Sequence, residues 1–221
     1  MSTFVLYGRP GWGSAIVEAQ LAWYGLPYRL EDAGDLFESE EARARLRPLN
    51  PITQVPTLVL PDGQVMTESA AITLHLADIT GSDHLVPGPK APERAAFLRW
   101  LVFIVANIYP TFTYGDIPER FVPAGGEAAQ GFRAEIDAYV RRLWLAVESQ
   151  AGTPWVLGGR FSALDLYAAV MTHWRPRRDW FAEHAPRVLA AADAAGALPA
   201  VAPVMAANFP PPAAAPTSTS G

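Results

Sequence analysis

Glu68 and Ser69 are adjacent at the predicted start of a helix, where they offer a carboxylate and a hydroxyl together. The first turn of a helix also carries free backbone N–H groups and the positive end of the helix dipole, which attract a carboxylate. Upstream, Val55-Pro56 opens an apolar segment, and a cis bond there would turn the backbone of Val55 outward towards an extended peptide. This combination suits a small, anionic peptide. The alternative is an ordinary helix start, with Thr67 as N-cap and Glu68 stabilising the dipole.

The segments around these residues predict a β-α-β unit followed by a β-β-α unit. The short connection between the first strands favours right-handed, parallel pairing. Asp62-Gly63 is typical of a hairpin turn. The expected elements are strands at 3–7 and 27–31 around a helix at 14–24, a surface helix at 39–46, hairpin strands at 56–60 and 64–66, and a helix at 68–78 that Gly81 closes.

The character of the sequence changes after Gly81. A Pro- and Gly-rich linker leads into segments with helical apolar spacing, among which 164–171 is apolar nearly all round and predicts a buried central helix. Ser162 and Asp165 have the spacing of a capping box at the start of that helix. We expect an α/β unit at 1–80, a linker at 81–91, an all-helical domain at 92–208 and a disordered tail at 209–221.

Composition excludes several classes of function. A formal net charge of −5 argues against a nucleic-acid-binding protein. The chain has no cysteine, so disulfides, thiolate nucleophiles and cysteine metal sites are excluded, and the histidines lack metal-ligand spacing. No signal peptide and no apolar run of ~18 residues is apparent, so we expect no membrane span and a cytoplasmic location.

Three motifs, in this order, resemble the cytosolic-type glutathione transferase family. They are Asn50-Pro51-Ile52-Thr53-Gln54-Val55-Pro56-Thr57-Leu58, Glu68-Ser69-Ala70-Ala71-Ile72 and Gly158-Gly159-Arg160-Phe161-Ser162-Ala163-Leu164-Asp165-Leu166. The resemblance extends from about Thr3 to Asn208 and implies a thioredoxin-like N-terminal domain followed by an all-α C-terminal domain. It also implies glutathione as co-substrate, a role in detoxification and a homodimer whose twofold axis lies near Thr67-Glu68-Ser69.

The same resemblance assigns a glutathione-binding set. Ser69 would donate to the γ-glutamyl carboxylate of the tripeptide and Glu68 would pair with its ammonium. Gln54 would reach towards the glycyl carboxylate. Val55, before Pro56, would offer its backbone to the cysteinyl residue.

A transferase must stabilise the thiolate of glutathione, because only the thiolate attacks electrophiles. The family's usual serine and cysteine positions fall on Gly11 and Gly13 here. Ser14, at a helix N-terminus, is therefore our first candidate for the catalytic donor, and a plain N-cap is its alternative. Tyr7 is the second candidate, and its alternative is packing beneath the helix.

The second substrate is predicted to be an apolar electrophile. Candidate wall residues, each of which could instead be core or surface, are Arg9, Trp12, Asn107, Tyr109, Tyr114 and Trp174. The basic and aromatic segment 174–180 suits an anionic aromatic molecule or simply ends a helix. The leading hypothesis is glutathione conjugation. A glutathione-dependent isomerase or peroxidase and a non-catalytic carrier protein are the alternatives.

Overall fold

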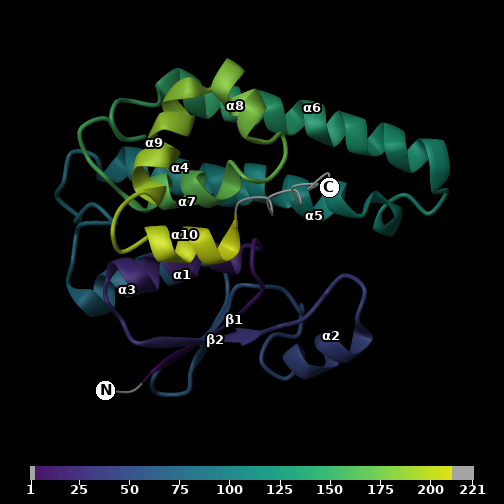
Figure 1. Ribbon diagram of the computed structural model, residues 1–221, viewed down its shortest axis with the longest axis horizontal. Helices are drawn as coiled ribbons and strands as arrows, with labels where there is room; N and C mark the ends of the chain where they lie inside the picture. The colour runs from purple at the N-terminus through teal and green to yellow at the C-terminus, as the bar shows by residue number, and fades with distance from the viewer. Residues whose placement is uncertain (1–2, 211–221) are drawn as a thin grey trace, which may run out of the picture.

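The computed structural model describes residues 3–210 and has a sheet with flanking helices at one end and a helical assembly beside it (Figure 1). The four strands lie in the order β2-β1-β3-β4. β1 is parallel to β2 and antiparallel to β3, and β3 is antiparallel to β4. The predicted thioredoxin-like unit is thus confirmed. Its elements are β1 (Phe4–Gly8), α1 (Ser14–Trp23), β2 (Tyr28–Asp32), α2 (Glu40–Leu46), β3 (Thr57–Val59), β4 (Val65–Met66) and α3 (Ser69–Thr80).

The two faces of the sheet are covered by different helices, because side chains alternate along β1. Phe4 and Leu6 are buried on the face that α1 and α3 cover, together with Val17 and Ile72. Tyr7 points to the opposite face, where it packs against the small apolar cluster beneath α2. β1 therefore joins two separate cores.

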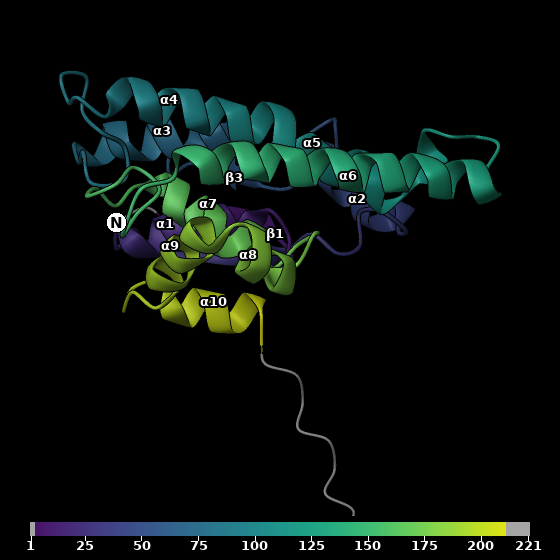
Figure 2. The ribbon, with the colours of Figure 1, turned by 90° about the horizontal axis from the view of Figure 1, so that it is seen from above.

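The predicted all-helical domain is also confirmed. α7 lies at its centre and contacts α1, α4 and α9. In Figure 2 α7 lies between α6 and α10. The helices are α4 (Arg94–Phe103), a π-helical turn η1 (Ile104–Ile108), α5 (Tyr109–Asp116), a 3₁₀ turn η2 (Pro118–Arg120), α6 (Gly126–Gln150), α7 (Ala163–Met171), α8 (Arg178–His184), α9 (Pro186–Gly196) and α10 (Ala202–Asn208).

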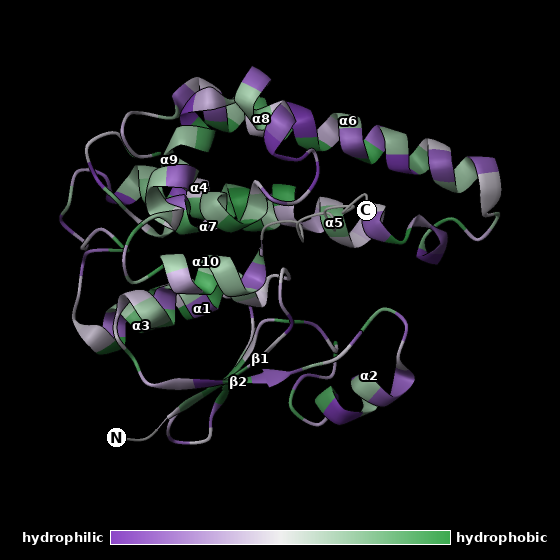
Figure 3. Cartoon of the chain, viewed as in Figure 1, coloured by the Kyte–Doolittle hydropathy of each residue, from purple (hydrophilic) through white to green (hydrophobic). Residues whose placement is uncertain are grey.

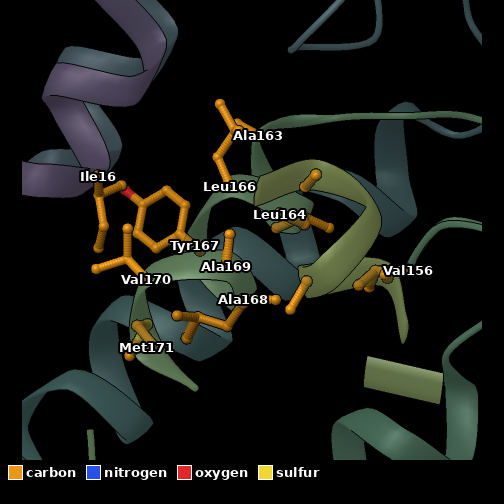
Figure 4. Packing of buried hydrophobic residues seen from close by; sticks show 14 of the residues in the cluster. Ile16, Val156, Ala163, Leu164, Leu166, Tyr167, Ala168, Ala169, Val170 and Met171 are labelled. Carbon is orange, nitrogen blue, oxygen red and sulfur yellow. The ribbon is translucent and has the colours of Figure 1, made fainter. Parts of the chain in front are cut away.

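Every residue of α7 is buried, as its apolar sequence predicts. Figure 3 shows α7 as almost uniformly hydrophobic, whereas hydrophobic and hydrophilic residues alternate along α6. Figure 4 shows the ring of Tyr167 beside Ile16 of α1. α7 therefore joins the helical domain to the sheet unit through shared apolar contacts.

The stretch Arg94–Asp116 is nearly one continuous helix, broken only by the π-helical turn η1. Pro110 follows this turn. A proline inside a helix lacks the N–H needed for the bond to residue i−4 and clashes with that carbonyl, and a wider turn relieves both problems. By length and composition alone this 23-residue stretch could cross a membrane, contrary to our expectation from sequence. In the fold Phe97 and Ile108 of this stretch are fully buried in the helical core, whereas Val102 is 57% exposed.

The C-terminal part of the described chain packs back against the protein. Phe209, which the sequence division places in the tail, donates its N–H to Met205 over 2.8 Å and stacks on His173 with ring centroids 4.1 Å apart. Residues 211–221 of the expected tail lie outside the described residues.

The capping box before α7 is present. The Ser162 N–H donates to one oxygen of Asp165 over 2.8 Å, and the Val156 N–H donates to the other over 2.8 Å. Ser162 Oγ accepts from the N–H of Leu164 at 3.3 Å. The buried carboxyl of Asp165 thus accepts hydrogen bonds from backbone N–H groups of both the helix start and the preceding loop.

Asp165 should make the stability of the fold depend on pH. Burial raises the pKa of Asp165 from 3.8 to about 6, against the lowering effect of its hydrogen bonds. The folded state therefore keeps a proton that the unfolded state has lost, and the contribution of this group falls as pH rises between these values. We expect the free energy of unfolding of wild type minus that of Asp165→Asn to decrease from about pH 4 to about pH 6 and then level off.

Urea unfolding at several pH values measures this difference, and Asp78→Asn makes the same chemical change at an exposed site of α3. A difference that stays flat or rises through the window would contradict the proposed titration of Asp165.

Candidate functional site

A cavity of about 680 Å³ separates the sheet unit from α5. The sheet unit contributes Gln54 and Pro56 together with Glu68 and Ser69, and the helical domain contributes Tyr109, among others. The structure therefore brings four of the five predicted peptide-binding residues to one cavity. Its volume is in the range of small-ligand sites, about 300–1,000 Å³.

The fifth residue, Val55, lies beside this cavity in a loop that the side chain of Asn50 holds in place. The Val55–Pro56 bond is cis. Asn50 Nδ2 donates to the carbonyl of Gln54 at 2.9 Å and to Thr57 Oγ1 at 3.1 Å, which fixes the loop on both sides of Val55. Within residues 3–210 neither backbone group of Val55 takes part in a hydrogen bond. Both remain available to a bound peptide.

Glu68 and Ser69 stand at the start of α3, as the sequence predicts, but in an unusual backbone conformation. Glu68 has φ of 63°, the left-handed region that residues other than glycine rarely adopt. Its side chain is exposed, whereas Ser69 is buried. Strained residues of this kind concentrate at functional sites, where the surrounding structure maintains them.

A buried hydroxyl cluster lies behind Ser69. Tyr167 of α7 is fully buried, and its Oη lies 3.4 Å from Oγ1 of Thr73. Burial raises the pKa of Tyr167 to about 12, although hydrogen bonds with Ser69 and Thr73 act in the opposite direction. The phenol is therefore neutral at ordinary pH and belongs to a network that orients the start of α3. The sequence did not identify Tyr167 as part of the site, because the apolar sequence of α7 indicates only that the helix is buried.

A second, smaller cavity of about 280 Å³ adjoins the first. Trp12, Phe37, Tyr109 and Thr113 line both. Its other walls are two glycines and six aromatic or charged residues, which are Gly11, Gly13, Phe112, Asp116, Arg133, Trp174, Arg175 and Arg177. Of the predicted wall residues, Trp12, Tyr109 and Trp174 reach this cavity, and Tyr114 reaches the larger one.

The charges of the smaller cavity are partly paired. Arg175 contacts Asp116 at 2.7 Å and also pairs with Asp137. The guanidinium of Arg177 donates to the carbonyl of His173 at 2.8 Å, and no carboxylate of the described chain pairs with it. Arg177 is also in the left-handed region, with φ of 81°. The basic segment that the sequence singled out thus supplies a cation to the cavity wall.

Ser14 does not face either cavity. It is buried, its Oγ accepts from the N–H of Arg9 at 3.1 Å, and its hydroxyl donates to the carbonyl of Arg9 at 3.3 Å. The N-cap of α1 is Gly13. Ser14 therefore closes the loop after β1, and neither role expected from the sequence, thiolate donor or N-cap, matches this position.

Three further expected residues lie away from the described cavities. Tyr7 packs under α2 on the far face of the sheet. Arg9 lies over the ring of Trp12 at 5.6 Å and 3.7 Å from Asp35. Asn107 donates to the carbonyl of Phe103 at 3.2 Å within its own helix. Tyr7 thus packs beneath α2 and not beneath the helix that begins at Ser14, whereas Arg9 and Asn107 are half-buried.

The loop between β1 and α1 is clamped by the helical domain. Trp174 Nε1 donates to the carbonyl of Gly11 at 2.8 Å, and the N–H of Gly11 donates to Oδ1 of Asn208 at 3.0 Å. Asn208 in turn donates to Glu18 of α1 at 2.9 Å. Nothing in the sequence pointed to Asn208, since its partner is 197 positions away. No group of residues that could hold a metal ion occurs within the described part of the chain.

Comparisons with known proteins agree with this geometry. A family model described as "Glutathione S-transferase, N-terminal domain" matches residues 14–79. The chain is 37% identical over 204 residues to the uncharacterized GST-like protein YncG of Escherichia coli K12, and the match covers 92% of this chain and 97% of that protein.

Two solved structures are also similar over nearly the whole chain. A glutathione transferase from Methylococcus capsulatus is 30% identical with a TM-score of 0.71, covering 93% of this chain and 98% of that one. A sphingomonad glutathione S-transferase complexed with glutathione is 26% identical with a TM-score of 0.72, covering 92% of this chain and 98% of that one. With the extent of the first relative and the matching fold, these similarities show that the chain belongs to the glutathione transferase family.

Proposed function

We propose that this protein is a glutathione transferase that binds glutathione in the larger cavity and activates its thiol for attack on an apolar electrophile. The observation that carries the proposal is the pair Glu68 and Ser69 at the start of α3, across one cavity from Gln54 and Pro56. A sphingomonad relative whose fold matches this one was solved with glutathione bound. The proposed location is the cytoplasm and the proposed role detoxification.

The charges of the larger cavity fit this tripeptide. Glutathione carries one ammonium and two carboxylates at neutral pH. The charged residues that line the cavity are Glu68, Arg43 and Arg120. Glu68 would pair with the ammonium, while the N-terminus of α3 with Ser69 would hold the adjacent carboxylate. Gln54, which is exposed at the other end, would reach the glycyl carboxylate.

The smaller cavity suits the electrophile. Trp12, Phe112 and Trp174 give it aromatic walls, and Arg177 adds a cation at its edge. An aromatic electrophile with an acidic substituent would use both features. Trp12 and Tyr109 border both cavities, so a bound thiol and an electrophile would meet between these side chains.

Retention on immobilised glutathione, followed by turnover of a chromogenic aromatic electrophile, tests this function. Retention without turnover of electrophiles or peroxides would favour the carrier protein, a possibility that the glycines at 11 and 13 support. A peroxidase or isomerase acting through the same bound thiol would be retained and would turn over its own substrate. Absence of cysteine excludes a glutathionyl-enzyme intermediate in each case.

Glutathione binding should depend on both residues at the start of α3. We expect Glu68→Gln and Ser69→Ala each to weaken binding by roughly 1–3 kcal/mol, because the ammonium of the tripeptide loses a charged acceptor in the first variant and its carboxylate loses a hydroxyl donor in the second. Isothermal titration calorimetry measures the loss. Glu38→Gln, on the exposed surface outside the described cavities, is the matched control. Unchanged affinity in both site variants would exclude this assignment.

We also propose a homodimer in which the start of α3 faces the helical domain of the partner. Ile52, at the rim of the larger cavity, is 70% exposed and would be covered by such a partner. Sedimentation velocity at micromolar concentration should give about twice the mass of one chain. A single-chain mass under the same conditions would contradict the proposed dimer.

A further inference from the structure

The reaction proposed above needs a hydrogen-bond donor for the sulfur of glutathione, and no hydroxyl side chain of the loop after β1 is free to supply one. Gly11 and Gly13 have no side chains, and the hydroxyl of Ser14 bonds to the backbone of Arg9. Tyr7 is on the far face of the sheet. A hydroxyl donor for the sulfur would therefore come from another element that reaches the same place.

The side chain that reaches this place is Tyr109 of α5. A Cβ atom built on Gly13 would lie only 1.5 Å from the hydroxyl oxygen of Tyr109 and 2.9 Å from its Cζ. The phenol therefore fills the space in which a side chain at position 13 would begin. That same point is 3.5 Å from the carbonyl oxygen of Val55, which precedes the cis-proline. The hydroxyl thus lies between the start of α1 and the backbone expected to pair with the cysteinyl residue.

We propose that the hydroxyl of Tyr109 donates the hydrogen bond that stabilises the thiolate of bound glutathione, taking the place of a donor from the loop after β1. This inference rests on the proposed function. The thiol loses its proton to solvent water, and the phenol keeps its own proton while donating it to sulfur. The lone pair of the thiolate then forms a carbon–sulfur bond with the electrophile in the smaller cavity, and the leaving group departs into solvent as an anion with the electron pair of the bond that breaks.

The hydroxyl of Tyr109 is free for this role, and its ring is held in place. Within residues 3–210 the hydroxyl forms no hydrogen bond, although the residue borders both cavities. The ring makes edge contacts with Trp174, 5.6 Å between centroids, and with Phe112 at 6.5 Å. Trp174 is itself bonded to Gly11. The same side chain therefore fixes both the phenol and the loop beneath it, as a preorganised donor requires.

Electrostatics keep Tyr109 in the form that can donate. Burial raises the pKa of Tyr109, and a negative charge on Glu68 or on an ionised Tyr167 acts in the same direction. The phenol is therefore neutral at ordinary pH and keeps the proton that it would donate. Around the smaller cavity Arg175 pairs with Asp116 and Asp137, and Arg133 pairs with Asp137. Arg177 pairs with no carboxylate of the described chain, and its charge favours a nearby thiolate over the thiol.

Tyr109→Phe tests the inference because it removes only the hydroxyl. We expect glutathione affinity to change by less than about threefold and the pKa of the bound thiol to rise by about one to two pH units, the effect of losing one hydrogen bond to a charged group. Turnover near neutral pH should fall by about ten- to a hundredfold. Tyr139→Phe, on the exposed side of α6, is the matched control and should retain the wild-type profile.

Thiolate absorbance during a pH titration of each glutathione complex gives the pKa of the thiol, and calorimetry on the same samples gives affinity. Tight binding with an unchanged thiol pKa in Tyr109→Phe would overturn the assignment of Tyr109 and leave the proposed function intact. A wild-type protein that binds no glutathione would overturn both.

Gly13→Ala provides a second variant that leaves the phenol in the chain but moves it. The new Cβ would occupy the position of the Tyr109 hydroxyl, so the side chain must shift. We expect the same rise in the pKa of the bound thiol as in Tyr109→Phe. A Gly13→Ala protein that binds glutathione with the wild-type thiol pKa would contradict the proposed position of the donor.

Discussion

The two hydrogen bonds to Gly11 are the constraint on which both cavities depend. Its carbonyl accepts from Trp174 and its N–H donates to Asn208, so the loop after β1 is tied to two separate parts of the helical domain. Gly11 has φ of +78°, a conformation that favours glycine, and a Cβ there would already be 3.4 Å from the carbonyl oxygen of Asn208. A side chain at this position is therefore disfavoured by the same contacts that hold the loop.

This constraint explains why the positions that carry serine or cysteine in much of the family are glycines here. The N–H and the carbonyl of Gly11 are both hydrogen-bonded to the helical domain, and the lack of a side chain at Gly13 leaves room for the phenol of Tyr109. Ser14, the nearest hydroxyl, closes the loop through Arg9 and so supports the conformation that the clamp requires. At Gly13 the phenol of Tyr109 thus fills the space that a loop side chain would otherwise occupy, and it is the donor that we propose.

The sequence was sufficient for features that depend on neighbours in the chain. The capping box at Ser162 and Asp165, the helix end at Gly81 and the parallel β-α-β unit follow from local signals. In α6 the buried residues Val140, Leu143, Trp144 and Val147 follow helical spacing, whereas Tyr139 beside them is 39% exposed. The position of Tyr109 depends on packing between distant segments, for which one sequence holds no local signal. The hydroxyl of Ser14 is fixed by the backbone of Arg9 in its own loop.

The π-helical turn at Ile104–Ile108 sets the direction in which Tyr109, the residue after it, points towards the cavities. Each residue of an α-helix turns the chain by about 100°, so an extra residue in one turn rotates everything after it by that amount. If the helix had no such extra residue, Ile108 would point in the direction in which Tyr109 now points. Ile108 is fully buried and apolar in the actual fold. Pro110 favours the wider turn by removing an N–H from the helix ladder. The aromatic wall of the cavities therefore follows from a break in helical register that Pro110 promotes and that the contacts of Tyr109 with Trp174 maintain.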